Sequence, residues 1–269
     1  MSLPPYAVNQ ASFPEMYERC LVGPLFLPWA RVLIERTAPA RGERILDIAC
    51  GTGIVARTAK VSVGTEGRVV GIDVSRPMLA IARSVAPAID WREGNAADLP
   101  LGAGEQFDVV LCQQGLQFFP DKPAAARQFR RALAPGGRLA VATWRPDAEI
   151  PIFGELRAIA ERHLGPIVDL RHSFGESEPL ERLLAESGFS DVRVETLSDT
   201  ARFDDGPVFA RLNTMALVGM SAAGKSMSDD ERARVVTAIV ADSQAVLQRY
   251  AAGNGVAFEI LSNVATGRG

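Results

Sequence analysis

The order of apolar and polar residues predicts strands that alternate with helices over the first half of the chain. Apolar runs typical of buried strands cover residues 44–49, 68–72, 89–92, 107–112 and 138–144. Amphipathic patterns predict helices over residues 28–37, 54–61, 76–85 and 123–133. Strands covered on both faces read as nearly continuous apolar runs, and strict alternation with helices is typical of parallel sheets. We therefore predict an α/β fold with a doubly wound, seven-stranded, mostly parallel sheet.

The pattern becomes mainly helical after residue 144. It predicts helices at 153–164 and 178–187, a strand at 191–203, helices over most of 207–251 and a final strand at 256–266. The helical stretch between the last two strands predicts an insertion late in the chain. We expect it to form a helical cap together with the preceding helices, over residues 145–178 and 204–255.

Residues that suit ligand binding follow the ends of the first four predicted strands. Gly51 and Gly53 follow the first strand, and Asp73, Ala96 and Gln113 follow the next three. Ligands of such sheets bind at the carboxyl ends of the strands. Glycines let a ligand approach the backbone closely. The apolar first strand also carries Asp47, whose negative charge suits a ligand with a cationic end.

Composition narrows the choice of partners. The 269 residues are 47% apolar and 23% charged, as in ordinary globular proteins. The net charge of −3 gives no basic field for nucleic acid. We expect no membrane span and no signal peptide. Cys20, Cys50 and Cys112 have no ligand-like spacing, and with only two histidines we predict no metal site and a cytoplasmic chain with reduced thiols.

Five motifs stand in order over residues 40–145. Asp47-Ile-Ala-Cys-Gly-Thr-Gly53 resembles the first motif of class I S-adenosylmethionine-dependent methyltransferases, and Gly71-Ile-Asp-Val-Ser75 resembles the second. The segments 94–100, 107–110 and 133–139 resemble the adenine loop, the fourth strand and the turn into the fifth. The chain is most similar to small-molecule enzymes related to ubiquinone/menaquinone-biosynthesis methyltransferases.

The resemblance implies a domain organisation and a cofactor. Residues 1–39 would be an N-terminal helical segment covering the cofactor site. Residues 40–145 would be the S-adenosylmethionine-binding core, and residues 146–269 the rest of the sheet with the cap and its substrate-binding insertions. The acceptor would be a small molecule, and a homodimer is a possible assembly.

The resemblance also assigns cofactor contacts. The turn would pack on the methionine part, with Asp47 helping to receive the ammonium and Tyr17 lying over the carboxylate. Asp73 would accept both ribose hydroxyls. Asn95 stands where the family usually has Asp and would accept from the adenine amino group. The implied cofactor-binding residues are Tyr17, Asp47, Ala49, Gly51, Thr52, Gly53, Asp73, Val74, Met78, Asn95, Ala96, Ala97 and Gln113.

Catalytic candidates are fewer. Gln117 would face the methyl-transfer centre, where some relatives carry a His that acts as a base, and Gln cannot do so. His172, in a loop beside Arg171, is the other candidate. The sequence leaves open whether a general base is used, and whether the attacking atom is oxygen, nitrogen or carbon. An apolar pocket could be lined by Phe118, Phe119, Trp144 and Phe153.

Three other interpretations compete. Gly51 to Ala56 also matches the G-x-G-x-x-A fingerprint of an NAD(P)-dependent oxidoreductase, although Asp47 would repel a pyrophosphate. A non-catalytic S-adenosylmethionine-binding protein would carry the same motifs. Gly219 to Ser226 matches the Walker A pattern, but no convincing strand precedes it, so we interpret it as a loop between cap helices.

Overall fold

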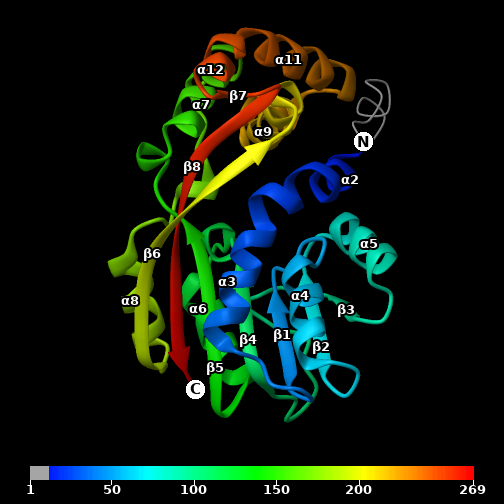
Figure 1. Cartoon of the computed structure of the whole chain (residues 1–269), viewed down its shortest axis with the longest axis vertical. Helices are drawn as coiled ribbons and strands as arrows, with labels where there is room; N and C mark the ends of the chain where they lie inside the picture. The colour runs from blue at the N-terminus through cyan, green and yellow to red at the C-terminus, as the bar shows by residue number, and fades with distance from the viewer. Residues whose placement is uncertain (1–11) are drawn as a thin grey trace. The chain divides into compact units, whose positions relative to one another are not determined.

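The strands form one sheet in the order β3-β2-β1-β4-β5-β8-β6, with β7 paired only to β8 (Figure 1). The computed structural model describes residues 12–269. Strands β1 to β5 are parallel, and β8 runs antiparallel to β5. The strands are β1 Arg44–Ile48, β2 Arg68–Asp73, β3 Asp90–Glu93, β4 Phe107–Gln113, β5 Leu133–Trp144, β6 Ser190–Phe203, β7 Ala251–Ala252 and β8 Gly255–Arg268.

The predicted α/β fold is confirmed, with two differences in the strands. The sheet has eight strands and not seven, because the two-residue β7 pairs with β8 and is too short to carry an apolar pattern. Strand β5 begins at Leu133, ahead of the predicted residue 138. Leu133 already pairs with Phe107, and a register shift follows before Val109 pairs with Arg138. The Pro-Gly-Gly turn therefore lies inside the strand and does not precede it.

Two units divide the described chain. The first contains the residues up to Leu25, Pro146–Ser173 and Ser198–Leu261. The second contains Phe26–Arg145, Phe174–Leu197 and Ser262–Gly269. The boundary falls inside both β6 and β8, so each of these strands contributes residues to both units. None of the helices in the described part of the chain is long and apolar enough to cross a membrane.

The second unit holds the parallel strands between two layers of helices. Helices α3 and α4 pack on one face, and α6 and α8 lie on the other. The apolar side chains of β1, β2, β4 and β5 that face α6 and α8 are fully buried with Phe129 of α6. This double cover explains the continuous apolar runs in the sequence. The helices are α3 Leu27–Thr37, α4 Ile54–Val63, α5 Arg76–Val85, α6 Lys122–Ala132 and α8 Ser177–Glu186, with the 3₁₀ turn η2 Leu116–Phe118.

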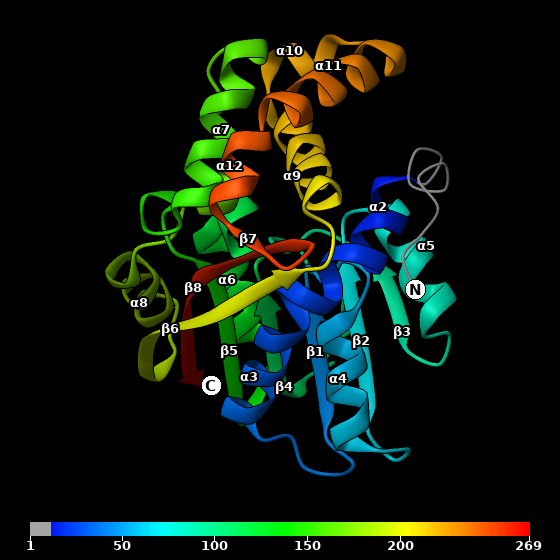
Figure 2. The same ribbon diagram turned by 45° about the horizontal axis from the view of Figure 1, so that its top comes forward.

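The first unit is built around α9, which contacts α2, α7, α10, α11 and α12 (Figure 2). The rings of Phe153, Phe203, Phe209 and Phe258 form its aromatic core, with centroids 4.6–6.1 Å apart. The helices are α2 Phe13–Met16, the π-helical η1 Tyr17–Phe26, η3 Asp147–Glu149, α7 Pro151–Leu164, η4 Leu170–His172, α9 Gly206–Met220, α10 Ala222–Ser226, α11 Asp229–Asp242 and α12 Gln244–Arg249.

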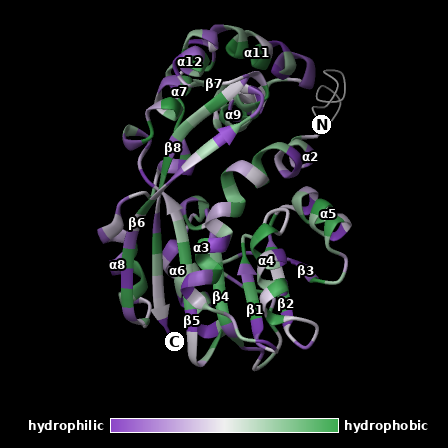
Figure 3. Cartoon of the chain, in the orientation of Figure 1, coloured by the Kyte–Doolittle hydropathy of each residue, from purple (hydrophilic) through white to green (hydrophobic). Residues whose placement is uncertain are grey.

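The helical insertion between β6 and β8 is confirmed as α9 to α12. Helix α11 begins with the capping box of Ser228 and Glu231, and it carries both hydrophobic and hydrophilic residues (Figure 3). Helix α8 falls within the second unit, although the prediction placed its first residues in the cap. The Walker A-like segment runs from the end of α9 into α10, and residues 206–220 before it are helical. The predicted loop is therefore wrong, because only Ser221 of the segment lies outside a helix. The rejection of a phosphate-binding loop holds, because such a loop follows a strand and a helix precedes this segment.

Candidate cofactor-binding site

The carboxyl ends of four parallel strands bring the predicted cofactor residues to one edge of the sheet. β1, β2, β3 and β4 are neighbours and end at residues 48, 73, 93 and 113. The amide of Cys50 donates to the carbonyl oxygen of Ile72 (3.1 Å), and that of Gly94 donates to Asp73 (3.0 Å). The loops after these strands are therefore fixed to one another by the backbone, and they all lie in the second unit.

The turn after β1 combines three residues with positive φ. Ala49, Gly51 and Gly53 have φ values of +58°, +56° and +90°. A Cβ on Gly51 would meet no atom within 4 Å, so the turn is open there. A Cβ on Gly53 would lie 2.2 Å from Cη2 of Trp91. The two glycines therefore differ. Gly51 leaves open space at the turn, whereas Gly53 makes room for the ring of Trp91.

Asp47 lies beneath this turn with an exposure of 1%. Its Oδ2 accepts from the amide of Ala56 (2.9 Å), in the first turn of α4, where amides have no partner within the helix. Its Oδ1 is buried and has no hydrogen-bond partner among the described residues. Burial raises the pKa of Asp47 to about 8, the amide of Ala56 opposes this rise, and the charge of Asp73 adds to it. The site therefore holds an acidic group with one oxygen left unsatisfied.

Asp73 joins the first two strand ends. Its Oδ2 accepts from the amide of Gly51 (2.8 Å), and its Oδ1 accepts from the amide of Ser75 (2.8 Å). Burial raises the pKa of Asp73, while the amides of Ser75 and Gly51 act in the opposite direction. Each carboxylate oxygen has lone pairs for more than one hydrogen bond. The residue fixes the turn and retains capacity for hydroxyl donors.

The residues after β2 and β3 provide apolar surface and backbone polar groups. Val74 is 74% exposed, an unusual exposure for a branched apolar side chain, and Met78 on α5 is half-buried. Asn95 Oδ1 accepts from the amide of Ala97 (2.9 Å). The amide carbonyl of Asn95 thus already holds its own loop. Asn95 is exposed, whereas the next residue, Ala96, is buried.

Three glutamines cluster at the carboxyl end of β4, which ends at Gln113. Gln113 Nε2 donates to the carbonyl oxygen of Phe26 (2.9 Å), and its buried Oε1 has no partner among the described residues. Gln117 is 2% exposed, and its Nε2 lies 3.4 Å from Oε1 of Gln114. A Cβ on Gly115 would lie 2.5 Å from that of Ala49, which shows that this loop packs directly against the turn after β1.

Two predicted residues belong to the first unit and are therefore described apart from these loops. Tyr17 begins η1, where its ring lies 6.1 Å from that of Phe13. His172 ends η4, is 8% exposed and packs against Phe153 at 5.1 Å between ring centroids. Both proposed roles stay predictions. The predicted pocket residues Trp144 and Phe153 are core residues of different units, and Trp144 packs on Trp29 at 5.7 Å.

Two residues of the site were not predicted. Trp91 fills the space that Gly53 and Gly71 leave by having no Cβ. Gln114 adopts a φ of +53°, and its Nε2 donates to Ser262 Oγ (3.1 Å) on β8. A tryptophan in a short strand near two glycines was a usable signal for the first. The second depends on a contact between residues 148 positions apart, which no local pattern records.

These residues fit S-adenosylmethionine in charge and shape. The unsatisfied Oδ1 of Asp47 is an acceptor beside the turn, and the ligand carries an ammonium group. Gly51 leaves open space at the turn, and the Asp73 carboxylate stands at the end of the adjacent strand. A pyrophosphate fits less well, because the Asp73 carboxylate would repel it and a negative charge nearby would further oppose ionisation of Asp47. The residues at the strand ends therefore fit a cofactor that carries a cationic group.

Comparison with known proteins agrees with this class. Residues 45–137 match a family described as "Methyltransferase domain". The 2-phytyl-1,4-naphtoquinone methyltransferase of Synechococcus elongatus is 39% identical over 42% of this chain, and the chain spans about half (51%) of that relative. The Nocamycin O-methyltransferase of Saccharothrix syringae is 28% identical over 90% of this chain and 91% of the relative.

A solved structure shows the same fold. It is phosphoethanolamine N-methyltransferase 2 of Haemonchus contortus in complex with S-adenosyl-L-methionine, with a TM-score of 0.56 and 17% identity. The similarity covers 95% of this chain and 55% of that one. The chain is therefore similar to class I S-adenosylmethionine-dependent methyltransferases in its fold and in the sequence of residues 45–137. The two relatives named above are methyltransferases of small molecules by their names.

Gly53→Ala should destabilise the protein more than Gly51→Ala. Both substitutions place a side chain at positive φ, at a cost of about 1–2 kcal/mol. Only Gly53→Ala also forces a Cβ against Trp91, and overpacking adds roughly 1–3 kcal/mol. Urea unfolding of the two variants beside the parent chain measures both changes. Equal losses would show that Trp91 does not constrain the turn.

Proposed function

We propose that the chain transfers the methyl group of S-adenosylmethionine to a small-molecule acceptor. The observation that carries the proposal is the junction of Gly51 and Asp73, in which one buried carboxylate holds the turn after β1 against the end of β2. The family match covers the segment that contains this junction. The fold alone hosts several activities, so the site residues bear the weight of the functional argument.

The cofactor would be held along the strand ends. When bound, S-adenosylmethionine supplies an electrophilic methyl group on a sulfonium. Asp47 attracts the ammonium, and Ala49, Gly51, Thr52 and Gly53 form the turn against the methionine part. Asp73 accepts the ribose hydroxyls with the lone pairs that the amides of Gly51 and Ser75 leave available.

The adenine would lie between the loops after β2 and β3. Val74 and Met78 provide apolar contacts, which explains the high exposure of Val74. The loop of Asn95, Ala96 and Ala97 borders the ring edge. Because Asn95 Oδ1 already accepts from Ala97, we propose that the Asn95 side chain mainly shapes this loop.

The glutamine cluster would border the methyl-transfer centre. Gln113 Oε1 is a buried, unsatisfied acceptor in the loop that packs against the turn. Gln117 is neutral and takes up no proton, so it orients groups by hydrogen bonding. We propose an oxygen acceptor acidic enough to ionise without a strong base, an assignment favoured by the relative named as an O-methyltransferase. Placing such a nucleophile in line accounts for a large part of the rate.

The setting proposed for this activity is the cytoplasm. Cys20, Cys50 and Cys112 are all free thiols, and free thiols are typical of a reducing compartment. Burial raises the pKa of Cys50 and Cys112, so both are held as neutral thiols. They therefore act as apolar packing groups beside the site and not as nucleophiles.

A transfer assay tests the proposed activity. The chain is incubated with methyl-labelled S-adenosylmethionine and a panel of phenols, naphthoquinols, carboxylic acids and amines, and S-adenosylhomocysteine formation is followed. We expect product only in the presence of an oxygen acceptor. The rate should rise with the acidity of the acceptor until the acceptor is fully ionised at the pH of the assay. Binding of S-adenosylhomocysteine with no product from any acceptor would instead support the non-catalytic binding protein. Retention of NAD and not of S-adenosylmethionine would support the oxidoreductase.

Asp73→Ala should weaken S-adenosylhomocysteine binding by more than about tenfold, because two ribose hydroxyls lose their charged acceptor. Calorimetry on the full chain measures the affinity, with Asp73→Asn as a variant that retains the shape and one acceptor oxygen. Glu66→Ala is the matched control, since Glu66 is an exposed acidic residue outside the proposed cofactor-binding segments. Unchanged affinity in a folded Asp73→Ala variant would rule out the proposed ribose contact.

A further inference from the structure

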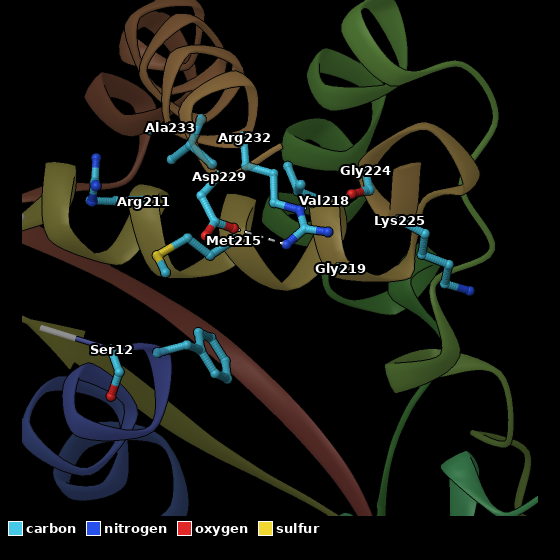
Figure 4. A pocket seen from close by; sticks show the side chains of 12 residues that line it. Ser12, Arg211, Met215, Val218, Gly219, Gly224, Lys225, Asp229, Arg232 and Ala233 are labelled. Atoms are coloured by element: carbon cyan, nitrogen blue, oxygen red, sulfur yellow. Dashed lines mark hydrogen bonds and ion pairs between the residues drawn. The ribbon is translucent and has the colours of Figure 1, made fainter. Parts of the chain in front are cut away.

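The first unit contains a cavity of about 640 Å³, and none of the proposed cofactor residues lines it. Its walls come from the segment that begins α2 and from α9, α10 and α11 (Figure 4). This volume is within the usual range for small-molecule sites. The lining residues are Ser12, Phe13, Arg211, Met215, Val218, Gly219, Gly224, Lys225, Asp229, Arg232, Ala233 and Val236.

The charges on its wall favour an anion. Among the described residues that line the cavity, Arg211, Lys225 and Arg232 are cationic and Asp229 is the one carboxylate. Asp229 Oδ1 accepts from Arg232 (3.4 Å), drawn as a dashed line in Figure 4. Two positive charges are left in excess at this wall, although the whole chain has a net charge of −3. An excess of one sign in a cavity attracts a ligand of the opposite sign.

Arg211 supplies a second, independent observation. Its Nε is buried and has no hydrogen-bond partner among the described residues. A buried donor without a partner is costly, and such groups are rare in native proteins. Arg211 lies on α9 with Met215 one turn further along the same helix. Arg211 therefore brings a positive charge to the wall of the cavity, with one of its donors unpaired in the described structure.

The rest of the lining is apolar. Its apolar residues come from α2, α9 and α11, and they are Phe13, Met215, Val218 and Val236. Val218 and Val236 are buried. Ser12 lies across the cavity from Met215 in Figure 4. Met side chains adapt to ligands of irregular shape. The cavity thus has a cationic part and an apolar part, as an amphiphilic ligand requires.

The Walker A-like segment contributes side chains and not a phosphate loop. The amide of Gly224 donates to Ser221 Oγ (2.9 Å), and the amide of Lys225 donates to the carbonyl oxygen of Ser221 (3.2 Å). A Cβ on Gly224 would lie 2.0 Å from the carbonyl oxygen of Val218, so this glycine serves close packing. The amides that would cradle a polyphosphate are therefore used within the helical turn, whereas exposed Lys225 lines the cavity.

We propose that this cavity binds a small amphiphilic organic anion, with one carboxylate or phosphate group on an apolar body. The positive charges of the wall would attract the anionic group, and Met215, Val218 and Val236 would contact the apolar body. A sulfonium cofactor has the wrong charge for this wall. The cavity shares no residue with the proposed cofactor site, and the proposal does not depend on the proposed methyl transfer.

Calorimetry on the full chain tests the proposal with octanoate below its micelle concentration, octyl phosphate, inorganic phosphate and octanol. We expect both amphiphilic anions to bind at least about tenfold more tightly than inorganic phosphate or octanol, because each of these controls has only half of the required chemistry. The relative affinity of octanoate and octyl phosphate identifies the anionic group. Equal binding of inorganic phosphate, equal binding of octanol, or no binding of either amphiphile would overturn the proposal.

The variants locate the site. Arg211→Met should weaken octanoate binding by about tenfold and Lys225→Met by a few-fold, since each removes a cation from the anionic group. Arg234→Met is the matched control, because Arg234 is exposed on α11 and does not line the cavity. Arg211→Lys keeps the positive charge. It provides a second test at this position if the Arg211→Met variant does not fold. Equal affinity in Arg211→Met and Arg234→Met would contradict the site.

Asp73→Ala distinguishes this site from the cofactor site. It should leave octanoate binding unchanged, whether or not the proposed ribose contact exists. Loss of octanoate binding in a folded Asp73→Ala variant would show that the anion binds at the strand ends, and would overturn the assignment to the first unit. Circular dichroism and thermal unfolding of every variant identify those that have not folded.

Discussion

The turn after β1 depends on two buried carboxylates that accept backbone amides. Asp47 accepts from α4, and Asp73 accepts from the turn itself and from the start of α5. Burying a carboxylate is costly unless hydrogen bonds offset the loss of water. Here these hydrogen bonds connect the first two strand ends to two helix starts. The position of the turn is therefore set by the same groups that give the site its acidity.

This arrangement leaves the site incomplete in electrostatic terms. Asp47 is almost fully buried, and one of its oxygens has no partner among the described residues. The charge of Asp73 adds to the effect of burial on the pKa of Asp47. A cation at the turn would favour the ionised form of Asp47 and lower its pKa, whereas an anion would raise that pKa further. The charges at the turn therefore favour a cationic ligand over an anionic one.

Much of the fold could be predicted because its signals are local. Residues 76–85 form α5 within the predicted limits, since Ser75 caps it and Pro77 lies in its first turn. The central strands carry long apolar runs because helices cover both faces. Strand β7 was missed because two alanines carry no pattern. The early start of β5 depends on pairing with Phe107, which lies 26 positions earlier in the chain.

The site could be predicted only in part for the same reason. Asp47, Gly51, Gly53 and Asp73 stand at fixed distances from strand ends, so sequence spacing places them correctly. The neighbours of Gln117 depend on the positive φ of Gln114, and the anionic-ligand cavity combines residues 12–13 with residues 211–236. Such juxtapositions are created by tertiary packing. They leave no periodic trace in the sequence.

Proton release on ligand binding tests the central role of Asp47 most directly. In the free protein its pKa of about 8 keeps it largely protonated at pH 7, and a nearby ammonium favours the ionised form. Binding of S-adenosylhomocysteine at pH 7 should then release roughly one proton, and affinity should rise between pH 6 and 8. Calorimetry in phosphate and Tris buffers, whose ionisation enthalpies differ, measures the release. The account predicts a buffer-dependent enthalpy that Asp47→Asn abolishes; the same enthalpy in both buffers for the parent chain would contradict it.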